Sequence, residues 1–381
     1  MNGQNMLAER TVLFENAMNH RHNSRVPMFS NFWTWKYLDG GYDLYQVLHD
    51  YDLLEKANRE FHERYQFDCY MDIGTRNPLR VSDAFGGLMH HVDASGEALV
   101  VDDRTIMYPE EYPELRDDPQ EFYWTKAFHR YVKNGLTLAE FSNGVKEFMD
   151  FGAFVARIDS IFRFEYGAFS ASPPNTFIRS PFEFIFSYLR GMRESAMDIH
   201  KHQTELIETM DSMWETMCLP VLQRAMTADM TGSITSVGFA FLATSILSPS
   251  QFEKFYWRYF KQALDMAMAN NKRVFVFSEE EMLRFAEFYE DIPKGVLFIH
   301  PEQDDLIAFR KRLPNITIAG GMPASLLGYG TRQECIDYAK QLIDCLGEGY
   351  VFSTDKMMSY RNDAKRENLL AVTDFVRGYS Y

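Results

Sequence analysis

Apolar residues in the last third of the chain alternate between two spacings, one typical of buried strands and one typical of helices. Short apolar runs rich in Val, Ile and Phe fit strands that are buried on both faces. The longer segments between them carry apolar residues at helical spacing and begin at Ser, Thr or Asp caps. The predicted strands are RVFVF (273–277), VLFIH (296–300), ITIAG (316–320) and YVFST (350–354). Four successive β–α units predict a parallel sheet covered by helices, either a barrel or an open doubly wound sheet.

The first half of the chain has a less regular pattern. Residues 1–24 predict an N-terminal helix, and a helix at 52–66 lies between strands predicted within 25–33 and 67–74. The alternation and turn residues of 88–112 predict a β-hairpin excursion. Most of the chain from there to Ser248 is predicted to be helical, with a short strand at 168–172 and a helix break at Gly191. We expect one α/β domain covering residues 1–381.

Composition limits the partners and the compartment. The chain has 381 residues, with 54 Asp and Glu against 39 Lys and Arg, which gives a net charge of −15. This acidic balance argues against nucleic acid or an anionic membrane as the partner. No apolar run approaches the ~18 residues of a transmembrane helix, and the charged N-terminal segment lacks the apolar core of a signal peptide. Four cysteines without a CxxC pattern favour reduced thiols. We therefore expect a cytoplasmic protein.

Several short segments resemble the uroporphyrinogen decarboxylase superfamily. They are RVPMF (25–29), similar to the opening strand, FDCYMDIG (67–74), similar to the "FD…D" strand, SPFEFIFSYLRG (180–191), similar to the central helix entry, ITIAGGMPASLL (316–327) followed by GT, similar to the "GNxDPxxL" turn, and AKRENLLA (364–371), similar to the closing "EN" helix. Each segment is short, but their order and spacing carry the resemblance. It implies a (β/α)8 TIM-type barrel, to which the N-terminal helix and the hairpin are additions.

Other segments resemble one branch of that superfamily, the corrinoid-dependent methyltransferases and in particular the O-demethylases. The decarboxylases hold propionate groups with arginines after the first strand, whereas SNFWTWKYLDGGY (30–42) offers aromatic residues and Lys36. LRGMRESAMD (189–198), the Glu pair 279–280 and GTRQECIDYAKQLID (330–344) look like the methyltransferases. This resemblance implies methyl transfer from a small donor, methoxyaromatic or methylamine-like, to the Co(I) of a separate corrinoid protein. Homodimers are common in the superfamily.

The chain shows no corrinoid-binding module of its own. DIHKHQ (198–203) resembles the DxHxxG motif of corrinoid-binding domains, but Gln203 replaces the Gly and the segment is predicted to be helical. We therefore expect a carrier protein to supply the cobalamin. Two alternatives stay open, because a fold does not fix a function. One is a decarboxylase of a small or tetrapyrrole carboxylic acid, and the other is a non-catalytic ligand-binding homologue.

Polar residues that end apolar runs are the candidates for chemistry, because barrel active sites lie at the carboxyl ends of the strands. These residues are Asp72, Glu279, Glu280, His300, Glu302 and Asp355. Glu279 and Asp72 are predicted to be catalytic, with Glu279 acting on the leaving group as an acid or through a metal. Glu280 is predicted to bind the substrate. Helix capping at the surface is the simpler alternative for each of them.

The resemblance also bears on a metal. Thiol-methylating relatives hold zinc with an HxC pair on one strand and a Cys on the last strand. Here the pair falls on Phe277 and Glu279, and the last strand offers Asp355. Glu279, His300 and Asp355 are expected to converge at the barrel mouth, as oxygen and imidazole ligands that suit Zn²⁺.

Aromatic residues follow the first predicted strand. Phe32, Trp33 and Trp35 are predicted to line a substrate pocket, which suits a flat methoxyaromatic or, by cation–π contact, a quaternary ammonium. Packing in an ordinary core is the alternative. His90 and His91, in the predicted hairpin, are expected at the surface.

Overall fold

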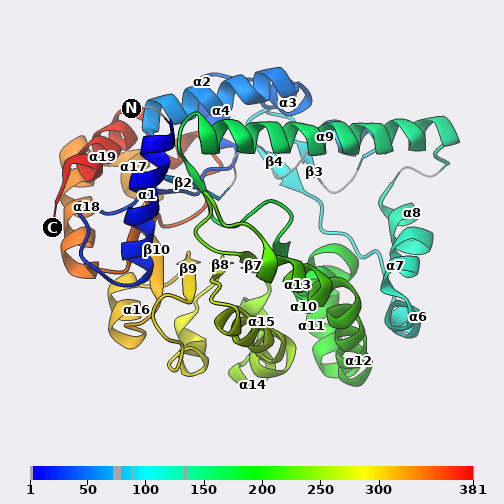
Figure 1. Cartoon of the computed structure of the whole chain (residues 1–381). Coiled ribbons are helices and arrows are strands. Elements are labelled where there is room, and N and C mark those ends of the chain that lie inside the picture. The colour runs from blue at the N-terminus through cyan, green and yellow to red at the C-terminus, as the bar shows by residue number, and fades with distance from the viewer. Residues whose placement is uncertain (1–2, 72–78, 88–89, 133–134, 381) are drawn as a thin grey trace.

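Strands and helices alternate around a central barrel (Figure 1). The computed structural model describes residues 3–71, 79–87, 90–132 and 135–380. The strands are β1 (Phe29–Ser30), β2 (Cys69–Tyr70), β3 (His90–Val92), β4 (Leu99–Val101), β5 (Phe169–Ser170), β6 (Phe177–Ile178), β7 (Val237–Phe241), β8 (Val274–Ser278), β9 (Leu297–Pro301), β10 (Thr317–Met322) and β11 (Tyr350–Thr354).

Backbone pairing joins eight of the described strands into a closed parallel ring. β1, β2 and β5 form one ladder, and β7 to β11 follow one another in a second ladder. Parallel bridges close the two gaps, one from Ser170 to Ser233 just before β7 and one from Met28 to Phe352 of β11. At the second gap the Phe352 N–H donates to the Pro27 carbonyl at 2.8 Å. The predicted (β/α)8 barrel is confirmed, and the open sheet is excluded.

Phenylalanine rings fill the inside of the barrel. Phe29, Phe275 and Phe298 come from three strands, and their ring centroids lie 5.2 to 5.7 Å apart. Alternate residues of each strand point outward into the layer beneath the helices, as expected for a packed barrel interior. Phe14 of the N-terminal helix α1 (Gly3–Met18) packs on Phe169 at 5.1 Å, so α1 belongs to the same interior cluster.

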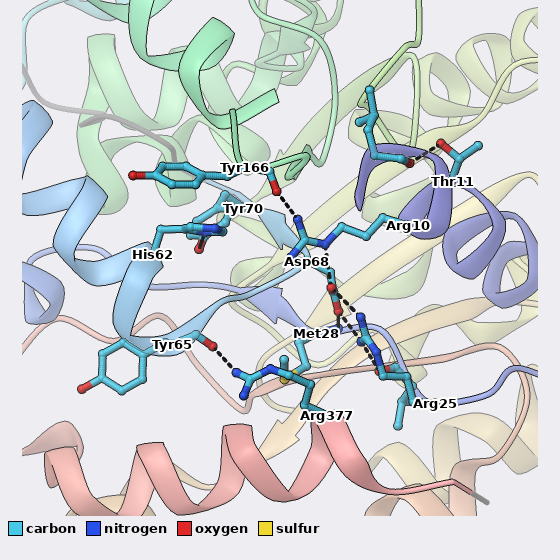
Figure 2. A network of polar contacts seen from close by, with 12 residues as sticks. Arg10, Thr11, Arg25, Met28, His62, Tyr65, Asp68, Tyr70, Tyr166 and Arg377 are labelled. Carbon is cyan, nitrogen blue, oxygen red and sulfur yellow. Dashed lines mark hydrogen bonds and ion pairs between the residues drawn. The ribbon is translucent and has the colours of Figure 1, made fainter. Parts of the chain in front are cut away.

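An ionic cluster fastens α1 to the strands (Figure 2). Asp68, just before β2, is 1% exposed and accepts from Arg10 of α1 at 2.8 Å and from Arg25 at 2.6 and 2.8 Å. It also accepts from the Met28 N–H at 2.9 Å. Burial alone raises the pKa of Asp68, but the hydrogen bonds and charges of the two arginines outweigh burial and lower this pKa to about 2.

Helices surround the barrel. Besides α1 they are α2 (Trp35–Gly40), α3 (Leu44–His49), α4 (Tyr51–Tyr65), α5 (Leu79–Ala84), α6 (Tyr112–Asp117), α7 (Pro119–Phe122), α8 (Phe128–Tyr131), α9 (Leu138–Phe164), α10 (Pro181–Phe184), α11 (Gly191–Lys201), α12 (Gln203–Met213), α13 (Leu219–Thr227), α14 (Pro249–Phe252), α15 (Arg258–Ala269), α16 (Leu306–Arg312), α17 (Ala324–Tyr329), α18 (Arg332–Leu346) and α19 (Arg366–Gly378). Figure 1 shows α9 extending well beyond the strands, with α6 to α8 below its far end. No helix among these described segments has the length and hydropathy needed to span a bilayer.

Three local predictions meet different outcomes. The hairpin is confirmed, since β3 and β4 pair antiparallel with His90 opposite Val101. The break at Gly191 is confirmed, and its positive φ of 73° is one that glycine adopts without strain. Residues 282–291, one of the longer segments predicted to be helical between two strands, instead contain only a short 3₁₀ segment, Leu283–Phe288. Phe285 leaves helical geometry, and its ring stacks on that of Phe252 with the centroids 4.1 Å apart. All four cysteines are free.

Candidate functional site

A cavity of about 470 Å³ opens at the carboxyl ends of the strands. Segments following β1, β2, β5, β7, β8 and β11 form its walls, and the β3–β4 hairpin contributes one side. The lining residues are Trp33, Met71, His90, Val101, Ser172, Pro173, Pro174, Asn175, Phe177, Arg179, Tyr188, Ala240, Leu242, Phe277, Glu279 and Met357. The location is where barrel proteins carry their active sites, and the volume suits a small organic ligand.

Two of the residues selected from the sequence line this cavity. Glu279 follows β8, and its N–H donates to the Phe241 carbonyl of β7 at 3.3 Å. Trp33 follows β1, and its N–H donates to the Met358 carbonyl at 2.9 Å. These backbone bonds tie each residue to a neighbouring strand or loop. The cavity therefore holds a carboxylate and an indole ring on fixed backbone positions.

Phe32 and Trp35 belong to the core and do not line the cavity. Phe32 is 2% exposed, and the centroid of its ring lies 5.2 Å from that of Phe61 in α4. Trp35 is 1% exposed, and its Nε1 donates to the Ala364 carbonyl at 3.2 Å. The prediction of three pocket aromatics is corrected to Trp33 alone. The reason is packing, because the ring of Phe32 lies against Phe61 of α4 and the ring of Trp35 lies against Tyr65 of the same helix.

The three predicted zinc ligands are not brought together as a metal site. His300 is fully buried between the rings of Phe29 and Phe277, and its Nε2 lies 3.3 Å from the Ser353 hydroxyl. The Asp355 carboxylate accepts from the Ala324 N–H at 2.9 Å, and burial raises the pKa of Asp355. The described residues contain no group of three His, Cys, Asp or Glu side chains able to hold a metal ion. Glu279, His300 and Asp355 therefore do not form such a group by themselves, and zinc binding stays a prediction.

The three other acidic residues selected at strand ends are not among the described lining residues of the cavity. Asp72 lies outside the described residues. Glu280 is half-buried but does not line the cavity, and its N–H donates to the Ser278 hydroxyl at 3.3 Å. Glu302 accepts from the Met357 N–H at 2.6 Å and from the Asn31 amide at 3.4 Å. It therefore connects the chain after β9 with the chain after β1 and β11.

Two cavity residues were missed or misplaced by the sequence patterns. Arg179 follows the short strand β6, and His90, expected at the surface, is half-buried in the cavity wall. Burial, together with the positive charge of Arg179, lowers the pKa of His90 to about 4. His90 is therefore neutral at pH 7. Among the described lining residues, Arg179 carries the positive charge and Glu279 the negative one.

A buried carboxyl group supports the cavity from behind. Glu183 of α10 is fully buried, and its Oε1 accepts from the N–H groups of Leu242 and Ala243 at 2.6 and 2.9 Å and from the Tyr256 hydroxyl. Burial raises the pKa of Glu183 despite these donors and the nearby Arg179 charge. Since Leu242 lines the cavity, Glu183 fixes the turn that forms this wall. The signal in the sequence was the Glu within SPFEF, an acid inside an apolar run.

The protein is of the α/β-barrel class, with a closed parallel barrel and a partly apolar cavity at the carboxyl ends of its strands. The sequence matches the profile of the Uroporphyrinogen decarboxylase (URO-D) family over residues 170–379, more than half of the chain. The chain belongs to this family.

Comparison with solved structures agrees with the fold. The chain is similar to a methyltransferase from Methanosarcina mazei, with a TM-score of 0.60 and 11% sequence identity over 97% of this chain and 98% of the other. At this identity the similarity describes the fold. A search of curated proteins found no match.

Proposed function

We propose that the protein is a methyltransferase that moves a methyl group from a small methylated donor to the Co(I) of a separate corrinoid protein. The observation that carries this proposal is the cavity at the barrel mouth. Much of its lining is aromatic or apolar, and Glu279 is the acidic residue among its described lining residues. Membership of the family and the fold shared with a methyltransferase support the reaction class.

Glu279 has the central chemical role in this proposal. When Co(I) attacks the methyl carbon, the carbon–oxygen bond breaks and its electron pair goes to the leaving oxygen. A carboxylic acid at Glu279 gives its proton to that oxygen and so stabilises the leaving phenol. Trp33, Phe277 and Tyr188 hold a flat donor in line with the attacking atom. No step is assigned to a protein-bound metal, because the described residues form no metal site.

We assign the cobalt to a separate carrier, because the one segment that resembles a corrinoid-binding motif departs from it at Gln203. The segment that resembles DxHxxG forms parts of α11 and α12, and its Asp198 is buried in an ion pair with Arg190 at 2.6 Å. Tyr112 also donates to Asp198 at 2.7 Å. These contacts give Asp198 a structural role. The cobalt is therefore expected to reach the cavity mouth on another protein.

A decarboxylase of a small acid is the second candidate, and Arg179 is the observation that favours it, because a guanidinium binds carboxylates well. The two reactions release different products. We expect methoxyaromatic donors with reduced carrier to yield the phenol, with one methyl group on the carrier for each phenol formed. Release of CO₂ from a small carboxylic acid, with no carrier present, would establish the decarboxylase instead.

A further inference from the structure

Arg179 presents an unsatisfied guanidinium nitrogen beside the cavity. Its side chain lines the cavity, and no residue in the described part of the chain accepts a hydrogen bond from its buried Nη1. The guanidinium carbon lies 5.8 Å from the centroid of the Tyr188 ring, another lining residue. A buried cationic donor without an acceptor is costly, and a bound ligand commonly supplies the missing acceptor.

The neighbouring ionisable groups leave this charge for a ligand. Glu183 interacts electrostatically with Arg179, but neither its Oε1, which accepts from two backbone N–H groups and the Tyr256 hydroxyl, nor its buried Oε2, which has no partner in the described part of the chain, is hydrogen-bonded to Arg179. Burial, as noted above, keeps His90 neutral, so that His90 neither adds to nor cancels the charge. The Arg179 guanidinium is therefore a charged donor on this side of the cavity, and it suits an anion better than a cationic donor.

The backbone holds Arg179 in place. The preceding strand, β6, pairs with β7 through Phe177 and Ile178, and the Cys218 thiol donates to the Arg179 carbonyl at 3.4 Å. Helix α10 then begins at Pro181. A charged group on such a fixed support loses little conformational entropy when it binds a ligand.

Arg179 and Glu279 stand at opposite sides of β7. β6 and β8 both pair with β7, so that about two strand spacings, roughly 10 Å, separate the backbones of these two residues. The side chains narrow this gap, and the apolar residues Ala240 and Leu242 lie between them. A ligand with one aromatic ring and a polar substituent at each end is long enough to reach both Arg179 and Glu279, and its apolar ring would lie against Ala240 and Leu242.

We infer that the methyl donor is an aromatic carboxylate, bound with its carboxylate on the Arg179 guanidinium and its methylated oxygen toward Glu279. This inference rests on the proposed function and narrows the donor class, because it excludes methylamine-like cations. The guanidinium fork and a carboxylate form paired, charge-assisted hydrogen bonds, which a neutral amide cannot match.

Binding to the purified full-length chain tests this inference without any cobalt. Calorimetry would compare 4-methoxybenzoate with 4-methoxybenzamide, which differ in charge and little in shape. We expect the acid to bind at least about tenfold more tightly than the amide. Arg179→Gln should weaken the acid about 10- to 100-fold and leave the amide nearly unchanged, while Arg179→Lys should retain part of the preference. The matched control is Arg193→Gln, which removes one exposed positive charge outside the cavity.

Four outcomes would overturn the inference. They are equal affinity for acid and amide, undiminished acid binding by Arg179→Gln, no binding of either compound, and displacement of the acid by inorganic phosphate at lower concentration than by benzoate. An equal loss of both ligands together with a lowered melting temperature in Arg179→Gln would also overturn it, because Arg179 would then serve to neutralise Glu183. Selective acid binding without methyl transfer to a carrier would reject the proposed function alone.

Discussion

Glu279 and Glu281 follow the same strand, but only Glu279 faces the cavity, whereas Glu281 is exposed. If Glu279 protonates the leaving oxygen, Glu279→Gln should lower the rate of methyl transfer by about 10²- to 10⁴-fold while donor binding changes little. Glu281→Gln is the matched control and should keep the full rate. The rate is measured as phenol released in the presence of reduced carrier, and zinc is measured in both proteins. A Glu279→Gln protein that loses bound zinc along with activity would replace the acid role with a metal role.

Trp33 and Trp35 lie two residues apart and have different environments. Trp33→Ala removes a ring from the cavity wall and should raise the KM for the donor by about tenfold, because apolar contact area is lost. Trp35→Phe, in the core, loses the hydrogen bond to the Ala364 carbonyl and should instead lower the stability by about 1 kcal/mol. Steady-state kinetics and urea unfolding of both variants separate the two effects. A larger change of KM in Trp35→Phe would contradict the placement of these rings.

At the scale of elements, the cluster of Asp68 with Arg10 and Arg25 links α1 to the start of β2 (Figure 2). Asp68→Asn leaves two largely buried arginines without their partner and should lower the free energy of unfolding by about 3–5 kcal/mol at pH 7. Asp374→Asn, an exposed partner of Arg377, serves as the control and should change this energy by less than about 1 kcal/mol.

The same cluster gives a dependence on pH. The pKa of Asp68 is lowered to about 2 in the folded state, below the ordinary value near 3.9. Its ionised form therefore stabilises the fold fully above about pH 5, by about 2–3 kcal/mol, and this contribution is lost as the pH falls through about 4 and toward 2. The difference in the free energy of unfolding between the wild type and Asp68→Asn should therefore be smaller at pH 3 than at pH 7, by about half of this contribution. Urea unfolding at pH 7 and pH 3 measures it, and a constant difference would contradict the assigned pKa.

The regular half of the chain could be predicted because its strands are buried on both faces and its helices carry caps. The strands from β8 to β11 lie where continuous apolar runs placed them, and Thr331 and Glu334 form the capping box that begins α18. β7 was missed, because VGFAF contains Gly and Ala and its pairing with β6 and β8 is visible only in three dimensions. Tertiary packing also explains the 3₁₀ turn at Phe285.

The site was harder to predict than the fold. Glu279 could be identified because it ends a predicted strand, and Trp33 because it belongs to an aromatic cluster after the first strand. Both predictions use the local sequence pattern and the rule that barrel active sites lie at the carboxyl ends of the strands. Arg179 and His90 come from a short added strand and a hairpin, and the sequence does not show that these segments fold over the same cavity. His300 was placed at the mouth by its position at a strand end, but its side chain points inward between two phenylalanine rings.

At the scale of the whole molecule, the cavity opens at one end of the barrel, while α1 packs on the interior cluster through Phe14. In the proposed function, a carrier protein would approach the end formed by the carboxyl termini of the strands, where the β3–β4 hairpin lies. The proposed division of labour is that this chain supplies the donor site and the acid, and the partner supplies the cobalt. Neither protein should complete the reaction alone.

The absorbance spectrum of a reduced corrinoid carrier, recorded under anaerobic conditions with a methoxyaromatic acid, tests this central claim most directly. We predict that the Co(I) spectrum converts to that of methyl-Co(III) only after the protein is added, with one phenol released for each carrier methylated. Donor and protein without carrier should give no phenol. Demethylation of the donor in the absence of any cobalt species, or a carrier that stays as Co(I) in the complete mixture across methoxyaromatic and methylamine donors, would contradict the account.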